Sequence, residues 1–232
     1  MLEVRDLRSG YGNALAVDGI SFGVARGESL AILGRNGAGK TTTLKTLTGL
    51  IRPWSGAIDF KGRPIAGLTA DTIARAGIGY VPEDRRIFES LSVTENLLAG
   101  EKPGANGTAW TTARVFDLFP EIARRADAAA GTLSGGERQM LAVGRALMGN
   151  PELLLLDEPS EGLAPVVVNR LGEALGALRD DGIAILISEQ NRRLARQVAE
   201  DLVIIETGRI VFSGSFAGLD TDPDIAARHL GV

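Results

Sequence analysis

Short apolar runs alternate along the chain with segments in which apolar residues recur at helical spacing. The runs "SLAILG" (29–34), "ELLLLD" (152–157) and "IAILIS" (183–188) are almost wholly apolar, which is typical of strands buried on both faces of a parallel sheet. "GIGYV" (77–81) predicts a further strand, and "DLVIIETGRIVFSG" (201–214) predicts a hairpin at its Thr-Gly pair. This alternation predicts an α/β fold with a mostly parallel sheet.

The segments between these runs predict helices. The helix that follows Lys40 places Leu44, Leu47 and Leu50 on one side. Most of the stretch from about 84 to 150 is helical by the same criterion. We therefore expect one domain over 1–232, with a core in 1–83 and 151–232 and an inserted helical subdomain. Other helices are predicted over 92–100, 115–128 with a break at Pro120, 134–148, 166–182, and around Leu194 and Val198.

Composition excludes several classes of protein. The 232 residues are 44% hydrophobic and 23% charged, as in ordinary soluble domains, and a net charge of −4 gives no general attraction to nucleic acid. The chain has no cysteine, which excludes a disulfide and a cysteine-based metal site. The start lacks the apolar core of a signal peptide, and no run approaches the roughly 18 apolar residues of a membrane span. We expect any membrane role to come through a partner.

The segment "GRNGAGKTT" (34–42) has the pattern of a phosphate-binding loop. It fits G-x-x-x-x-G-K-[ST] and stands between a predicted strand and a predicted helix, the context that this motif requires. Glycines let backbone N–H groups curl around phosphate oxygens, and the helix N-terminus adds partial positive charge. Lys40 can reach the β- and γ-phosphates, and the Thr41 hydroxyl can ligate Mg²⁺. The predicted nucleotide-binding residues are Asn36, Gly37, Ala38, Gly39, Lys40, Thr41 and Thr42.

A pair of acids, Asp157 and Glu158, ends the strand at 152–157. In an open parallel sheet, ligands bind outside the carboxyl ends of the strands, so we expect this pair beside the phosphate loop. Asp157 can hold Mg²⁺ through water, and Glu158 can polarise a water molecule for attack on the γ-phosphate. The alternative is two acids that simply end a strand in solvent, and the phosphate loop disfavours it.

The segment "LSGGERQM" (133–140) predicts a helix that begins at a second anion site. Ser134 and Glu137 have the spacing of a capping box. A capping box needs no glycine, yet Gly135 and Gly136 occupy the first turn, where each costs about 1 kcal/mol relative to alanine. Bare N–H groups at a positive helix end can bind an anion. Because one nucleotide already has its cradle at 34–42, this second site suggests a composite site closed by another subunit.

In this order and spacing, "GRNGAGKTT", "LSGGE" and "LLLLDEPS" resemble the nucleotide-binding subunits of ATP-binding cassette transporters, over about residues 2–213. The resemblance implies a P-loop NTPase core of RecA-like type, an antiparallel β subdomain and an inserted helical subdomain. It also implies a head-to-tail dimer in which ATP and Mg²⁺ lie between the phosphate loop of one subunit and the "LSGGE" segment of the other. Hydrolysis would then drive separate permease subunits at the cytoplasmic face of the inner or plasma membrane.

The resemblance also assigns roles outside these three motifs. Tyr11 matches an aromatic residue that stacks on adenine. Ser160, Glu161, Gly162 and Leu163 match a loop that crosses the dimer. The segment "YVPEDRRIF" (80–88) matches a lid that senses Mg²⁺ and contacts the membrane subunit.

Two positions depart from the usual family pattern. The lid usually carries glutamine, but here Glu83 stands in its place as a candidate Mg²⁺ ligand with Thr41 and Asp157. The family usually places histidine after the fourth core strand, where this chain has Gln190, a candidate catalytic residue beside Glu158. The single histidine, His229, lies three residues from the C-terminus, where we expect a solvated tail.

Several short stretches resemble one branch of this family, the second ATPase subunit of branched-chain amino acid importers. They are "VPEDRR", "DEPSEGLAP", "SEQN" and the ending "HLGV". Importers of urea and short amides are closely similar, so both solute classes stay open. The resemblance implies an identical or related ATPase partner, permease subunits and, indirectly, a periplasmic or extracellular solute-binding protein.

Three other functions compete with transport. An ATP-dependent clamp with little hydrolysis is suggested by Gln190, because an amide cannot become cationic as histidine can. A soluble cassette ATPase of DNA repair or translation is disfavoured by the single cassette, the acidic pI of 5.2 and the lack of long heptad repeats. A P-loop kinase is disfavoured by the "LSGGE" segment.

Overall fold

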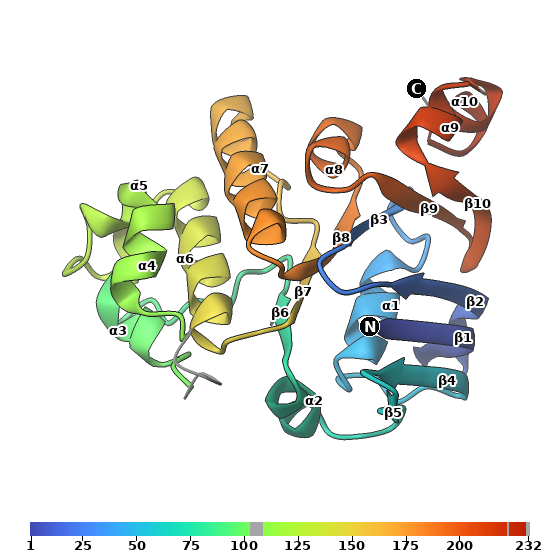
Figure 1. Ribbon diagram of the computed structural model, residues 1–232, viewed down its shortest axis with the longest axis horizontal. Coiled ribbons are helices and arrows are strands. Elements are labelled where there is room, and N and C mark those ends of the chain that lie inside the picture. The colour runs from blue at the N-terminus through green and yellow to red at the C-terminus, as the bar shows by residue number, and fades with distance from the viewer. Residues whose placement is uncertain (103–108, 222, 231–232) are drawn as a thin grey trace.

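The computed structural model describes residues 1–102, 109–221 and 223–230. Its largest sheet has the strand order β10-β9-β3-β8-β7-β6 (Figure 1). All pairings within it are parallel except that of β9 with β10, which confirms the predicted α/β fold and the C-terminal hairpin. The strands are β3 (Ser29–Leu33), β6 (Ile78–Val81), β7 (Leu153–Asp157), β8 (Ala184–Glu189), β9 (Asp201–Glu206) and β10 (Arg209–Ser215).

The central strands are buried on both faces because alternate residues enter two different cores. Ile187 of β8 joins the core that contains α7 (Pro165–Asp180) and α8 (Arg192–Val198). Leu186 faces the other core, which contains α1 (Lys40–Leu47) and the second sheet. The continuous apolar runs in the sequence therefore have a packing reason, since neither face of the strand meets water.

The second sheet is antiparallel and has the order β2-β1-β4-β5. Its strands are β1 (Leu2–Tyr11), β2 (Ala14–Val24), β4 (Ser55–Phe60) and β5 (Arg63–Pro64). Along β1, Leu2, Val4 and Leu7 are buried while intervening residues are exposed. One face is thus wet, which is why these strands produce no continuous apolar run. This sheet is the antiparallel β subdomain that the resemblance implied.

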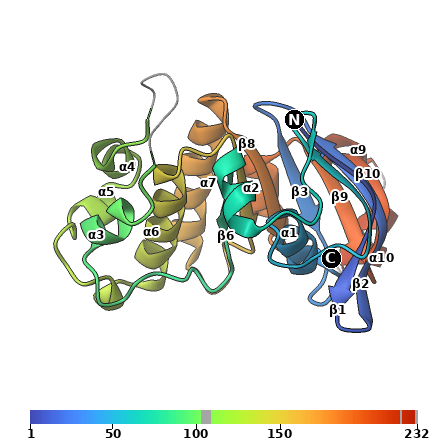
Figure 2. The same cartoon turned by 90° about the horizontal axis from the view of Figure 1, so that it is seen from below.

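The middle of the chain is helical and lies at one side of the molecule, opposite the antiparallel sheet (Figure 2). The predicted capping box at Ser134 is present, and a second one is present at Ser92. Pro120 is the first residue of α5 and separates it from α4, as expected of a residue without a backbone N–H. The helices are α2 (Ala70–Ala76), α3 (Val93–Leu98), α4 (Thr112–Leu118), α5 (Pro120–Ala123), the 3₁₀ turn η2 (Ala130–Thr132) and α6 (Gly135–Met148).

Two predictions about packing are wrong. α1 ends at Leu47, and Leu50 is 50% exposed, because Gly49 leaves the helical path with a φ of 73°. His229 is not a solvated residue: its side chain is 16% exposed, and its Nδ1 lies 2.9 Å from Oε2 of Glu206. The C-terminal helices α9 (Phe216–Asp220) and α10 (Pro223–Leu230) bring it back to the end of β9. The last two residues of "HLGV" lie outside the described residues.

Candidate functional site

Three loops meet at one edge of the central sheet because of its strand order. β3 pairs with β8, and β8 pairs with β7. The phosphate loop (34–42) follows β3, Gln190 follows β8, and Asp157 and Glu158 end β7. Parallel strands end at the same edge, so residues far apart in the sequence become neighbours there.

Gly39 shapes the entrance of α1. Its φ is 112°, and a Cβ at this position would lie 2.5 Å from the backbone oxygen of Ala16. Gly39 is also the N-cap of α1, and no side chain caps this helix end. The first backbone N–H groups of α1 therefore lack a side-chain partner, at a helix end with partial positive charge. Both features suit an anion.

Lys40 is held inside the site by three oxygen atoms. Its Nζ donates to the backbone oxygens of Gly34, at 2.7 Å, and Arg35, at 3.1 Å. The same Nζ lies 3.0 Å from Oε1 of Glu158, and the two side chains are only 3% and 8% exposed. A buried ion pair is costly to form unless its geometry is good, so each charge here depends on the other. An entering phosphate would compete with Glu158 for Lys40.

Asp157 accepts hydrogen bonds from three hydroxyl groups. Thr41 and Ser188 donate to Oδ1, at 3.0 and 2.7 Å, and Tyr80 donates to Oδ2, at 3.1 Å. Burial and the nearby Asp157 carboxylate raise the pKa of Tyr80 well above its usual range, so the phenol stays protonated and remains a donor. Sequence reasoning gave neither Tyr80 nor Ser188 a role at Asp157, although Tyr80 begins the predicted lid segment. A further signal was their position near the carboxyl ends of two strands.

Glu158 adopts a left-handed backbone conformation, with a φ of 43°, that is uncommon for a residue with a side chain. Its backbone N–H donates to the oxygen of Ser188 at 3.0 Å. Gln190 donates from Nε2 both to Oε2 of Glu158 and to Oδ1 of Asn36, at 2.7 Å each. Uncommon backbone conformations such as that of Glu158 cluster at functional sites. The amide of Gln190 thus connects the acidic pair to the phosphate loop.

A cavity of about 440 Å³ opens over the phosphate loop. Tyr11 borders it with a half-exposed ring, and Glu83 borders it from the lid. The structure therefore brings together candidate residues from four separate segments of the chain. The lining residues are Tyr11, Ala16, Asn36, Gly37, Gly39, Lys40, Thr41, Thr42, Glu83, Glu158 and Glu161.

Glu83 lies in a strongly acidic part of this cavity. Burial, followed by the charges of Glu161, Glu158 and Asp157, raises the pKa of Glu83 above its ordinary value. Like charges at short range disfavour ionisation of one another, and a cation placed among them would relieve this repulsion. The site thus has the electrostatic character that a divalent cation requires.

The "LSGGE" segment does not line this cavity. It begins α6, where Ser134 Oγ accepts from the N–H of Glu137 at 3.3 Å and Glu137 Oε2 accepts from the N–H of Ser134 at 2.8 Å. Burial opposes ionisation of Glu137, but the hydrogen bonds from Ser134 outweigh it and lower the pKa of Glu137. This helix end, with Gly136, borders a different pocket that contains Arg124 and Arg125. Within one chain the two predicted anion sites are therefore separate (Figure 1).

Arg85 connects the lid to α6 and to the loop at 160–163, a link that sequence reasoning did not predict. Its Nε donates to Oε1 of Gln139 on α6, and its Nη2 donates to the backbone oxygen of Glu161, both at 2.9 Å. Its φ of 60° is again uncommon for a residue with a side chain. One guanidinium thus joins the lid, the "LSGGE" helix and the loop at 160–163.

Comparisons with known proteins found relatives that match the whole chain. The family model described as "ABC transporter" matches residues 17–161. A high-affinity branched-chain amino acid transport ATP-binding protein, BraG of Pseudomonas aeruginosa, is 41% identical over 232 residues, which is the full length of both chains. The lipopolysaccharide export system ATP-binding protein LptB of Acidithiobacillus ferridurans is 34% identical over 233 residues, covering 100% of this chain and 97% of that protein.

Solved structures with the same fold are also found. A nucleotide-free ATP-binding cassette of an ABC transporter superposes with a TM-score of 0.85 at 25% identity, covering 100% of this chain and 98% of the other. An ATP-binding cassette in its ADP conformation superposes with a TM-score of 0.82 at 26% identity, covering 97% and 96%.

Proposed function

Because the chain belongs to the ABC transporter family, as one of its ATP-binding ATPase subunits, we propose that it powers a membrane importer of branched-chain amino acids. The observation that carries the proposal is the cluster of Lys40, Glu158 and Gln190 beside the N-terminus of α1, where Gly39 is the N-cap. The solute class is supported by the full-length similarity to the branched-chain amino acid protein of Pseudomonas aeruginosa. Glu83 and Gln190, the two departures from the usual family pattern, support the same branch.

The phosphate loop would hold the nucleotide. Backbone N–H groups at the start of α1 point to where the β- and γ-phosphates would lie, and Lys40 would exchange its contact with Glu158 for a phosphate oxygen. Tyr11, at the rim of the same cavity, would stack on the adenine. Asn36, Ala38 and Thr42 complete the segment predicted to surround the phosphates.

The side chains of Thr41 and Asp157 fit a Mg²⁺ site. Their hydroxyl and carboxylate oxygens are 3.0 Å apart, and Glu83 borders the same cavity. Among the described residues, no three acids or histidines cluster as a complete metal site. Mg²⁺ commonly binds through one or two protein carboxylates together with phosphate and water. When bound, Mg²⁺ would neutralise charge on the β- and γ-phosphate oxygens.

Glu158 would polarise the attacking water, and Gln190 would orient it. The carboxylate of Glu158 is buried, fixed on one side by Lys40 and on the other by the Gln190 amide. An amide can donate one hydrogen bond and accept another, so Gln190 can contact a phosphate oxygen without a titrating proton. The clamp alternative has one observation in its favour: both carboxylate oxygens of Glu158 already have partners in this structure.

A second ATPase subunit would complete the site. Ser134, Gly136 and Glu137 border a pocket separate from the cavity over the phosphate loop, and Gly135 lies between Ser134 and Gly136 in the chain. One chain therefore cannot contact the same phosphate from both sides. A head-to-tail dimer, homomeric or with a related chain, would bring them together. The loop at 160–163 would then cross the interface.

The permease would dock in a groove of about 430 Å³ between the central sheet and the helical segment. Leu50 and Phe88 are large, half-exposed apolar residues that line it. Arg145 packs its guanidinium 4.8 Å from the Phe88 ring centroid. No helix in the described ranges is long and apolar enough to cross a membrane. From the family of the chain, we propose peripheral attachment at the cytoplasmic face through permease subunits, with a solute-binding protein as an indirect partner.

Replacement of Glu158 tests the proposed chemistry. Glu158→Gln keeps the shape of the side chain but cannot act as a base, so we expect phosphate release to fall by about 100-fold or more. ATP should stay bound and hold two chains together, as a dimer on size-exclusion chromatography. Glu173→Gln, on the exposed side of α7, is a matched control. A monomer in the presence of ATP would count against the shared site, and wild type that binds ATP but releases no phosphate would favour the clamp.

Uptake in proteoliposomes tests the solute class. The chain would be reconstituted with the permease subunits that co-purify with it and with the corresponding solute-binding protein. Leucine uptake that depends on ATP is the expected result. Urea uptake without leucine uptake would favour the short-amide alternative, and export of lipid would place the chain with its lipopolysaccharide export relatives instead.

A further inference from the structure

Glu189 is a buried carboxylate to which the proposed chemistry assigns no role. It is the last residue of β8 and is only 2% exposed. Oε1 accepts a hydrogen bond from the backbone N–H of Ser160 at 2.9 Å. Oε2 accepts from the backbone N–H groups of Gln190 and Asn191, at 3.1 Å each. No arginine, lysine or histidine within residues 1–102, 109–221 and 223–230 forms an ion pair with it.

These hydrogen bonds join two loops of the site. Ser160 lies two residues after Glu158, and Gln190 directly follows Glu189. A second link runs parallel to the first, because the backbone N–H of Glu158 donates to the oxygen of Ser188 at 3.0 Å. The loop that carries Glu158 and the strand end that carries Gln190 are therefore joined by two sets of hydrogen bonds, which fix the contact between the Glu158 carboxylate and the Gln190 amide.

A carboxylate suits this position better than any other side chain of its size. All of its neighbours in these contacts are N–H donors, and a carboxylate is an acceptor only. An amide of the same shape would turn its NH₂ group toward one of these donors, and that contact would become repulsive. Burial raises the pKa of Glu189, while hydrogen bonds from the Ser160 side chain and from the backbone N–H groups of Asn191 and Ser160 act against this shift and stabilise the charged form. Burial of an unpaired charge is costly, and such a cost is typical of functional positions.

We propose that Glu189 is a positioning residue for ATP hydrolysis. Its carboxylate ties the loop that follows the acidic pair to the strand end that carries Gln190, and so sets the distance between Glu158 and the Gln190 amide. The inference rests on the site proposed above. It predicts that nucleotide binding, which depends on the phosphate loop, is independent of Glu189. The chemical step and the loop at 160–163 depend on it.

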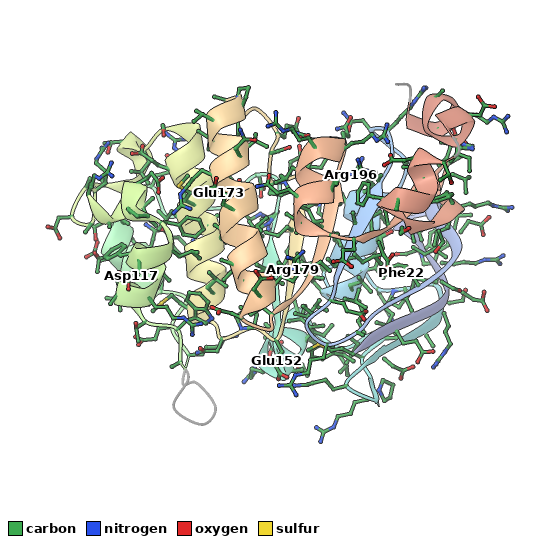
Figure 3. The ribbon with its side chains drawn as sticks, turned by 45° about the horizontal axis from the view of Figure 1, so that its top comes forward. Phe22, Asp117, Glu152, Glu173, Arg179 and Arg196 are labelled. Atoms are coloured by element: carbon green, nitrogen blue, oxygen red, sulfur yellow. The ribbon has the colours of Figure 1, made fainter. Side chains whose placement is uncertain are left out.

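The test is Glu189→Gln in the full-length chain, with steady-state phosphate release measured against Mg-ATP concentration. We expect kcat to fall by about 10- to 100-fold, because a misplacement of about 1 Å has effects of this size. KM for ATP should change by less than about threefold, since the phosphate loop keeps its structure. Glu189→Asp keeps the charge and should recover part of the lost kcat. Glu173→Gln, labelled on α7 in Figure 3, is the control for loss of one carboxylate.

The outcomes separate this inference from the function on which it rests. A Gln variant with kcat within about twofold of an active wild type would overturn the role of Glu189 alone. So would a fall in kcat with an equal rise in KM that Glu189→Asp does not relieve, because that pattern indicates general damage. If the Gln variant does not fold, the Asp variant decides by the same split between kcat and KM. If the wild-type chain itself neither binds nor hydrolyses ATP, the proposed function fails together with the inference.

Discussion

Replacing Gln190 with alanine removes one amide that contacts two loops at once. Its Nε2 lies 2.7 Å from Oε2 of Glu158 and 2.7 Å from Oδ1 of Asn36. A hydrogen bond to a charged group contributes about 1.5–3 kcal/mol, whereas one between neutral groups contributes about 1 kcal/mol. The bond to Glu158 is the one that would act in the chemical step. Its loss therefore sets the size of the expected effect.

Loss of about 1.5–3 kcal/mol in the transition state lowers turnover by about 10- to 150-fold. The assay is phosphate release at saturating Mg-ATP, with ATP affinity measured separately by equilibrium titration. Affinity should stay nearly constant because Lys40 and the helix N-terminus are unchanged. Gln190→His should keep much of the activity, since an imidazole can still donate a hydrogen bond.

The control is Gln197→Ala, which removes an exposed amide of α8 that lies beside α7, with its Nε2 3.5 Å from the backbone oxygen of Asn169. Its turnover should match that of wild type. Unchanged turnover in Gln190→Ala at unchanged ATP affinity would remove Gln190 from the mechanism. A large loss of ATP affinity would instead assign the amide to nucleotide binding through Asn36.

Two further variants test other parts of the site. Gly39→Ala would place a Cβ 2.5 Å from the Ala16 oxygen at a φ of 112°. ATP binding should therefore be lost, and the free energy of unfolding should fall by about 1–3 kcal/mol. ATP titration and thermal unfolding measure these two effects, and normal ATP binding would contradict the prediction. Arg85→Ala removes the bonds to Gln139 and to the Glu161 oxygen, so stimulation of the ATPase by the permease should fall several-fold more than the basal rate; equal losses would contradict a linking role.

Features that depend on neighbouring residues could be predicted from the sequence. The central strands could be predicted because strands buried on both faces consist of continuous apolar runs. The capping box at Ser134 could be predicted because it is a contact between residues three positions apart. The phosphate loop was readable because glycine, lysine and threonine at fixed spacing have few other uses. The antiparallel sheet, with one wet face, was expected only from the family resemblance.

Contacts between distant segments were decided by the tertiary structure. Periodicity extended the face of α1 to Leu50, but the backbone turns away at Gly49. The position of His229 near the C-terminus predicted a solvated side chain, but the chain folds back and places His229 against Glu206. The turn at Gly49 is a local signal that apolar periodicity does not take into account. The contact of His229 depends on a segment far away in the sequence, so local patterns could not predict it.

The same reason explains what the sequence revealed about the site and what it did not. Short motifs named Lys40 and Glu158 one by one, and the family resemblance named Gln190. Only the order β3-β8-β7 brings them within hydrogen-bonding distance. Glu189 lies in the stretch "SEQN", but no local pattern indicates its role, since its partners include backbone N–H groups that every residue but proline carries. Its place between the two loops depends on strand pairing, which the tertiary structure alone determines.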